Sequence, residues 1–232
     1  MESRTLKYFI LPVCVAAALS CLPAWAARPD CCKQKDIVRP GFDESLLEGF
    51  EPSKAERQDE ARGTVTVRIR DTFRPTMKVI QSETVVAAPV DVMWEVLCDL
   101  DAYPRMFDRM ARSETTLNAG EWGHNYNEVQ YPWPWGKRWV LNVIHNDRPR
   151  LVSRFKRLEG TIRELEGRFE VRPAPGGGAL LRYGVRMDPG LDFVPAWLLS
   201  WATSILVPEI LRDFRGEAEL RQDRKLISAA LR

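Results

Sequence analysis

Residues 193–215, FVPAWLLSWATSILVPEILRDFR, predict a long helix that needs apolar cover on several sides. Trp197, Trp201, Ile205 and Pro208 recur at spacings of four, four and three residues, which places them on one helical face. A neighbouring face carries four more apolar side chains, those of Leu199, Leu206, Ile210 and Phe214. Because strand-like runs precede this helix along the chain, we expect a sheet curled around it.

A membrane span is the alternative for this stretch, since its length is close to that of a bilayer-crossing helix. Charged residues argue against a span, because Asp192 precedes the apolar run and Glu209, Arg212 and Asp213 end it. We therefore expect the helix to be covered by protein.

The composition is that of a globular protein with a sizeable core. With 232 residues, 45% of them hydrophobic, the chain is expected to form one domain with extensions. Its 34 basic and 32 acidic residues nearly balance, so no partnership with nucleic acid is expected. The eight tryptophans indicate core packing or, as the alternative, the apolar wall of a cavity.

Residues 1–26 are predicted to be a signal peptide. Two basic residues charge its start, residues 8–22 are apolar, and Ala24 and Ala26 supply the small residues for cleavage after Ala26. This pattern predicts a periplasmic or secreted protein. The alternatives are a retained membrane anchor and a lipoprotein anchored at Cys21, whose preceding residues loosely resemble a lipobox.

Cysteine and histidine are scarce in the remaining chain. Cys31, Cys32 and Cys98 are too few for a disulfide framework, and Cys98 is expected to be buried on a helix. The adjacent Cys31 and Cys32 could cross-link two chains or join Cys98, and both options stay open. With only His124 and His145, and no paired-cysteine motif, we predict neither a metal site nor a cofactor.

The mature chain divides into a leader over 27–61, a main domain over 62–222 and a C-terminal tail over 223–232. The leader is polar, and short helices are expected in it over 44–50 and 54–62. We expect it to form a tether and a helix that lies on the main domain.

The main domain alternates apolar and polar residues in a way that is typical of half-buried strands. Strands are predicted over 64–70, 77–86, 113–117, 124–131, 138–145, 151–158, 165–171 and 180–187. Two short helices are expected after the second strand, over 90–99 and 102–110. In the last strand Tyr183 and Met187 lie opposite Arg182 and Arg186, so we expect one face of the sheet to meet solvent. The pattern predicts an α+β fold in which a meander sheet holds the long helix.

Three segments resemble the START-like lipid-transfer and polyketide-cyclase superfamily, namely residues 83–107, 131–148 and 188–215. Seven residues of the first segment match the superfamily pattern: Ala88, Pro89, Trp94, Leu97, Asp99, Tyr103 and Pro104. The two strands upstream resemble the additional first hairpin of true START domains. The resemblance covers about residues 62–217. It implies a helix-grip fold, in which a curved antiparallel sheet wraps around the C-terminal helix and a deep cavity lies between them.

The implied cavity predicts a binding site for a hydrophobic ligand. Its expected lining residues are Tyr126, Glu128, Trp139, Leu141, Tyr183, Met187, Trp197, Trp201, Ser204 and Ile205. Apolar walls with a few polar groups suit an amphiphile, whose tail is bound by buried area and whose head is bound by hydrogen bonds. The alternative is that these side chains contact each other and fill the core.

No catalytic residue is predicted, because the sequence has no nucleophile elbow, phosphate loop or dinucleotide fingerprint. Glu128 shares strand parity with Tyr126. If it points inward, it would bond a ligand hydroxyl or pair with Arg154 or Arg182; if it points outward, it is a solvated glutamate. A cyclase would need such a group as its acid–base residue, and export argues against that role.

We therefore expect a non-enzymatic monomer that binds and transports a lipid, such as a sterol or phospholipid, in the cell envelope. The alternatives are a cyclase- or hydrolase-type enzyme acting in the same cavity and a scaffold with a filled core. The expected gate combines the loop 188–195 with the turn 131–135. Trp133 and Trp135 in this turn lie beside Lys137, which suits transient contact with a membrane surface.

Overall fold

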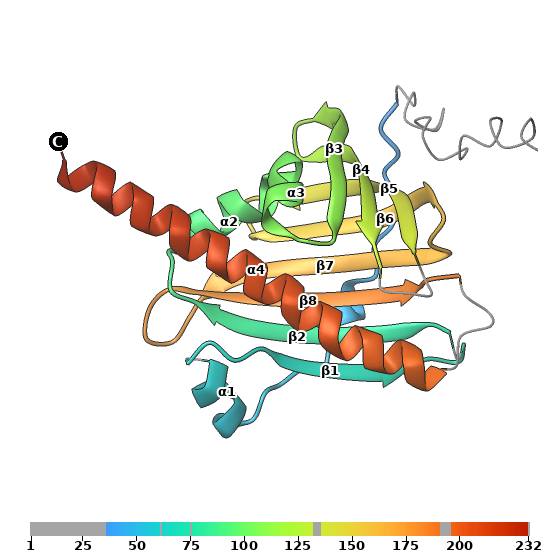
Figure 1. Ribbon diagram of the computed structural model, residues 1–232, viewed down its shortest axis with the longest axis horizontal. Helices are drawn as coiled ribbons and strands as arrows, with labels where there is room; N and C mark the ends of the chain where they lie inside the picture. The colour runs from blue at the N-terminus through green and yellow to red at the C-terminus, as the bar shows by residue number, and fades with distance from the viewer. Residues whose placement is uncertain (1–35, 61, 75, 132–135, 191–195, 232) are drawn as a thin grey trace, which may run out of the picture.

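The computed structural model describes residues 36–60, 62–74, 76–131, 136–190 and 196–231, with the backbone alone described over 196–205. One antiparallel sheet has the strand order β1-β2-β8-β7-β6-β5-β4-β3 (Figure 1). Its strands are β1 (Thr66–Asp71), β2 (Lys78–Val86), β3 (Met110–Ala119), β4 (Trp122–Gln130), β5 (Lys137–Asp147), β6 (Val152–Gly160), β7 (Glu164–Pro173) and β8 (Ala179–Asp188). After β2 the chain passes to the far edge, and β3 to β8 then return strand by strand to pair with β2.

Three short helices make the passage from β2 to β3: α2 (Val90–Cys98), η3 (Leu100–Ala102) and α3 (Tyr103–Met106). The second predicted helix is shorter than expected, because Phe107 already has an extended backbone with φ −115° and ψ 115°. The backbone N–H of Gln130 donates to the carbonyl of Arg109 at 2.7 Å, so strand pairing begins where the helix was expected to continue.

Helix α4 (Ala196–Ala230) crosses the sheet on the same side as α2 (Figure 1). We call this side of the sheet the concave face. Val207, Leu211, Phe214 and Ala218 recur at spacings of four, three and four, and all four are buried in one core with α2, β2, β7 and β8. The predicted α+β helix-grip fold, with a curved sheet around a long C-terminal helix, is confirmed.

Helix α4 extends well beyond the predicted end at residue 215. Its second half is rich in Glu, Ala, Leu, Arg and Lys, which favour helix. Arg215 pairs with Glu219 at 2.9 Å and Arg221 pairs with Glu217 at 2.7 Å, four residues apart in each case. The last turns project past the sheet (Figure 1). Of the helices that the structure describes, none is long and apolar enough to cross a bilayer.

The opposite side of the sheet, which we call the convex face, is covered by the described part of the leader. Its elements are η2 (Glu44–Leu47) and α1 (Lys54–Glu60), and Figure 1 shows the segment before β1 running behind the sheet, away from α4. Leu46, Leu47 and Phe50 are buried there. A side chain at Gly184 on β8 would place its Cβ 2.7 Å from the Leu46 carbonyl oxygen, so glycine permits this close approach.

The convex face of β7 and β8 is therefore not in solvent, which corrects the expectation from the alternating pattern. Glu166, Glu170 and Arg182 are buried beneath the leader. Arg182 donates to Glu83 at 3.1 Å, to Glu170 at 3.3 Å and to the Phe50 carbonyl at 3.0 Å. A polar strand face can be buried when its charges are paired in this way, and alternation alone does not reveal the cover.

Candidate functional site

An aromatic cluster identifies which strand residues point toward α4. Phe169 on β7 stacks on Tyr183 of β8 with ring centroids 4.3 Å apart and meets Phe214 of α4 edge-on at 5.5 Å. Phe155 on β6 joins them, 6.0 Å from Phe169. Because directly paired residues of neighbouring strands share a face, these rings set the facing of the remaining strands.

The register carries this facing to β5 and β4. Phe155 pairs with Ile144 on β5, and Ile144 pairs with Gly123 on β4. Even-numbered residues of β5 and odd-numbered residues of β4 therefore point to the concave face.

The predicted site residues divide between the two faces. Tyr183 and Met187 lie on the concave face, as expected. The other four described residues lie on the convex face, away from α4: Tyr126, Glu128, Trp139 and Leu141. This corrects the expected inward orientation of Tyr126, Trp139 and Leu141, and for Glu128 it is the outward one of the two alternatives. The remaining four have side chains outside the described part of the structure: Trp197, Trp201, Ser204 and Ile205. Contact with a ligand stays a prediction for all ten.

Glu128 belongs to a polar and aromatic cluster on the convex face. It accepts a hydrogen bond from the Tyr126 hydroxyl at 2.9 Å and forms an ion pair with Lys137. Trp139 stacks on Tyr126 at 5.8 Å. Burial raises the pKa of Glu128, but the bonds from Lys137 and Tyr126 outweigh it, so its pKa is lower than usual. An ionised, paired carboxylate of this kind is poorly suited to act as a general acid.

Neither predicted arginine partner reaches Glu128. Arg154 bonds instead to Glu44 of the leader at 2.8 Å, and Arg182 pairs with Glu83 and Glu170. Both arginines are thus held by the leader, Arg154 by the Glu44 carboxylate and Arg182 by the Phe50 carbonyl, and neither is a partner of Glu128.

The concave face of β3 to β6 carries a row of polar side chains that the sequence analysis missed. We call it the concave polar row: Ser113, Asn125, Asn127, Arg138, Asn142 and Arg157. Asn125 is paired with Asn142, and Asn142 is paired with Arg157 on its other side, while Ser113 is the cross-strand partner of Asn127. Asn142 is only 4% exposed and Asn125 only 1% exposed. The row lies on the same sheet face as the aromatic cluster.

Hydrogen bonds satisfy only part of this row. The Asn125 amide donates to the Ser113 hydroxyl at 3.2 Å, and the Asn127 amide donates to Asn125 at 2.5 Å. Among the described residues, four buried atoms of this row have no partner: Oδ1 of Asn127, Oδ1 of Asn142, Nε of Arg138 and Nε of Arg157. An unpaired buried polar group costs about 1–3 kcal/mol, and native proteins contain few of them. Four such atoms on one face indicate a place for an additional polar group.

Two tyrosines border this region and remain protonated. Burial raises the pKa of Tyr131 to about 12, with nearby Arg138 acting in the opposite direction. Burial also raises the pKa of Tyr183, and the proximity of Tyr131 adds to the effect. Both phenols are therefore neutral hydrogen-bonding groups at physiological pH.

The two histidines and Cys98 provide no catalytic group on the concave face. His124 and His145 pair with Val143 and Trp122, so both belong to the convex face, and burial lowers the pKa of His124. Burial raises the pKa of Cys98 to about 12, which makes its thiol a poor nucleophile. Within the described ranges no cluster of His, Cys, Asp and Glu could hold a metal ion.

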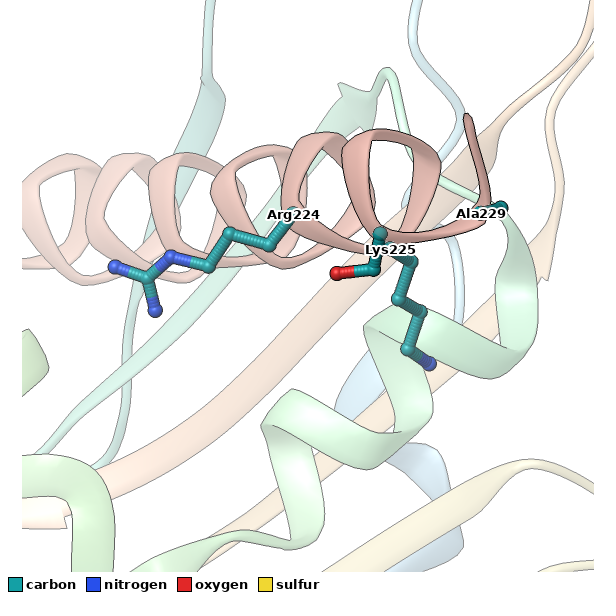
Figure 2. Close-up of a pocket in the computed structure, with 4 residues that line it drawn as sticks. Arg224, Lys225 and Ala229 are labelled. Carbon is teal, nitrogen blue, oxygen red and sulfur yellow. The ribbon is translucent and has the colours of Figure 1, made fainter. Parts of the chain in front are cut away.

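A surface pocket of 340 Å³ lies elsewhere, near the end of α4 (Figure 2). Its lining consists of Arg224, Lys225, Ser228 and Ala229, all of them exposed. Lys225 forms an ion pair with Glu95 of α2 at 2.7 Å. With an exposed lining and no core residue, this pocket does not resemble an enclosed site for an apolar tail.

Comparison with known proteins agrees with the fold. The sequence model of the family described as "Polyketide cyclase / dehydrase and lipid transport" matches residues 86–215, more than half of the 232 residues. The chain belongs to this family. No curated protein sequence matches the chain.

Solved structures of this superfamily share the architecture at low sequence identity. A STAR-related lipid transfer protein from Xanthomonas axonopodis has a TM-score of 0.58 and 19% identity over 67% of this chain and 93% of that one. The Zhui aromatase/cyclase from Streptomyces sp. R1128 has a TM-score of 0.55 and 20% identity over 62% and 95%. Human STARD10 has a TM-score of 0.56 and 10% identity over 75% and 83%. The family thus includes both lipid transfer and cyclisation, and these likenesses establish the fold.

Proposed function

We propose that this protein binds an amphiphilic, lipid-like ligand between the concave face of the sheet and α4, without changing it chemically. The concave polar row carries the proposal, because its buried unpaired atoms share a face with the aromatic cluster. The apolar tail of an amphiphile would contact the rings, while its polar end would pair with the amides and guanidinium groups. The fold shared with a named lipid transfer protein supports a carrier.

The second candidate is an enzyme of the cyclase type, which the likeness to an aromatase/cyclase supports. Cyclisation needs a proton donor or acceptor beside the ligand. The described members of the concave polar row include no Asp, Glu or His. Binding without turnover therefore fits this row better.

Native mass spectrometry of the purified protein, followed by organic extraction, tests the proposal. We expect one lipid per chain, recovered at its original mass, because the polar row and the aromatic cluster provide one site. Asn142→Leu should lower the bound fraction, since it removes a polar group from the row. The matched control Asn118→Leu, at the exposed end of β3, should keep the lipid.

A protein that stays free of lipid after incubation with mixed-lipid vesicles would contradict the proposed binding. A ligand recovered with loss of water would favour the enzyme instead.

The cell envelope is the proposed site of action, on the basis of the signal-like residues 1–26, which lie outside the described residues together with Cys31 and Cys32. The proposed gate also lies largely outside them, since Trp133 and Trp135 of the turn are among the undescribed positions. Fractionation of cells and N-terminal sequencing of the mature protein would test the location.

A further inference from the structure

The arginines of the two sheet faces differ in how their charges are balanced. On the convex face Arg154, Arg182 and Arg186 each pair with carboxylates, at 2.8 Å to Glu44, 3.1 Å to Glu83 and 2.7 Å to Glu166. On the concave face, no described carboxylate pairs with Arg138 or Arg157. The concave face therefore has two guanidinium charges without a counter-ion from the described chain.

Both concave arginines also have free donor capacity. The Nε–H groups of Arg138 and Arg157 are buried without an acceptor in the part of the chain that the structure describes. Arg157 is held in place by its Nη2, which donates to the Gly160 carbonyl at 3.0 Å, so its remaining donors are available. A guanidinium offers donors in a planar fork that matches the two oxygens of a carboxylate or phosphate. Both side chains are half-buried, and a partly desolvated positive charge without a counter-ion is costly, so an anionic group would relieve that cost.

The neighbouring amides extend this recognition beyond the charge. Asn142 is the cross-strand partner of Arg157, and its Oδ1 has no donor. Asn127 follows Asn125 as the next residue of β4 on the concave face, and its Oδ1 also lacks a donor among the described residues. These acceptors suit a hydroxyl group or an acid proton beside the anionic oxygen.

We propose that the polar end of the ligand is an anionic oxygen group, a carboxylate or a phosphate, bound by Arg138 and Arg157 with Asn142 beside it. This inference rests on the proposed function and names the ligand class for the same site. It separates an acidic lipid from a sterol or another neutral lipid, because a neutral hydroxyl would leave two guanidinium charges without a counter-ion.

Binding of three lipids that share one hydrocarbon chain but differ in head group, together with one sterol, tests the inference. The delipidated protein is titrated with oleate, oleoyl lysophosphatidate, oleyl alcohol and cholesterol, and each Kd is measured by calorimetry or probe displacement. We expect at least one of the two anionic lipids to bind at least tenfold more tightly than oleyl alcohol. The ratio between oleate and lysophosphatidate then distinguishes a carboxylate ligand from a phosphate ligand.

Arginine variants test the residues themselves. Arg157→Gln and Arg138→Gln should each weaken binding of the preferred anionic lipid by about tenfold to a hundredfold, the range for a lost hydrogen bond to a charged group. Their affinity for oleyl alcohol should change little. Arg150→Gln, in an exposed turn, is the matched control and should bind like the parent protein. Arg157→Lys keeps the charge but loses the fork, so it should bind between the parent and Arg157→Gln.

The outcomes separate the two proposals. If neutral and anionic lipids bind equally and the arginine variants change neither, the anionic head group is wrong while lipid binding stands. If none of the four lipids binds, the proposed function fails. Circular dichroism of each variant shows whether it folds; because two arginines are tested independently, loss of folding in one leaves the other as the test.

Discussion

Single charged side chains decide how each face of the sheet is used. Arg182 on the convex face has three acceptors within 3.3 Å, from Glu83, Glu170 and the Phe50 carbonyl. Arg157 on the concave face has one acceptor among the described residues, the Gly160 carbonyl. The same residue type is therefore fully paired on one face and only partly paired, within the described residues, on the other. A buried carboxylate can also lack sufficient pairing with positive charge, and Glu60 is an example.

Glu60 predicts a pH dependence of stability. Burial, together with the nearby Glu83 charge, raises the pKa of Glu60 from 4.5 to about 7. Between these values the folded state keeps a proton that the unfolded state releases, so the free energy of unfolding falls as the pH rises through this window. Glu60→Gln should raise the free energy of unfolding by up to about 3 kcal/mol at about pH 8 and have little effect near pH 4.

Urea unfolding at both pH values measures this difference, with the exposed Glu48→Gln as the control. An equal gain at both pH values would show that the Glu60 charge is not the cause.

At the scale of elements, the leader segment 36–50 contributes to the fold although it lies outside the family match. Asp43 pairs with Arg186 at 2.7 Å, and the Gln81 amide donates to the Leu46 and Glu48 carbonyls at 2.9 and 3.0 Å. These contacts place the leader across β2, β7 and β8 on the convex face. Substitution of a buried apolar residue of the leader tests how much this attachment contributes to the free energy of unfolding.

Phe50 and Phe73 form a matched pair for that test. Phe50 is 0% exposed under the convex face, whereas Phe73 is 85% exposed between β1 and β2. Phe50→Ala should lower the free energy of unfolding by about 3–5 kcal/mol, because it removes buried area and leaves a cavity. Phe73→Ala should change it by less than about 0.5 kcal/mol. Denaturant titration of both variants measures the two effects, and similar values for the two would contradict the attachment of the leader.

At the scale of the whole molecule, α4 has two parts with different roles. Its middle part carries Val207, Leu211 and Phe214 into the shared core, and Phe214 meets the rings of Tyr103, Phe107 and Phe169. Its last turns project beyond the sheet (Figure 1). The division of the chain at residue 222 thus stays a prediction that truncation can test.

Removal of residues 223–232 should leave the main domain folded. The loss includes the exposed ion pair between Lys225 and Glu95, and such pairs contribute about 0–1 kcal/mol. We expect a change of less than about 1 kcal/mol in the free energy of unfolding, with a small loss of helical circular dichroism signal. Phe214→Ala in the full chain is the comparison and should cost about 3–5 kcal/mol. A loss above about 2 kcal/mol for the truncation would place the last turns within the cooperative unit.

The sequence by itself determined the class of fold and the order of its elements. The all-round apolar first half of the 193–215 stretch predicted a covered helix, and alternation predicted eight strands near their observed positions. The ends of helices were predicted less accurately. Residues 216–230 form helix through local propensity and ion pairs, and they lack the apolar pattern on which the prediction of the helix depended.

Only the tertiary structure decided which strand residues share the concave face with α4. β5 has buried apolar residues on both parities, among them Leu141 and Ile144, so hydropathy could not assign its faces. The register from Phe155 to Ile144 did so, and it turned Tyr126 and Glu128 outward while it brought Asn142 inward. The face to which a strand residue points follows from pairing with strands distant in sequence. The convex face of β7 and β8 is covered by a leader more than a hundred residues away. Neither is a local property of the chain.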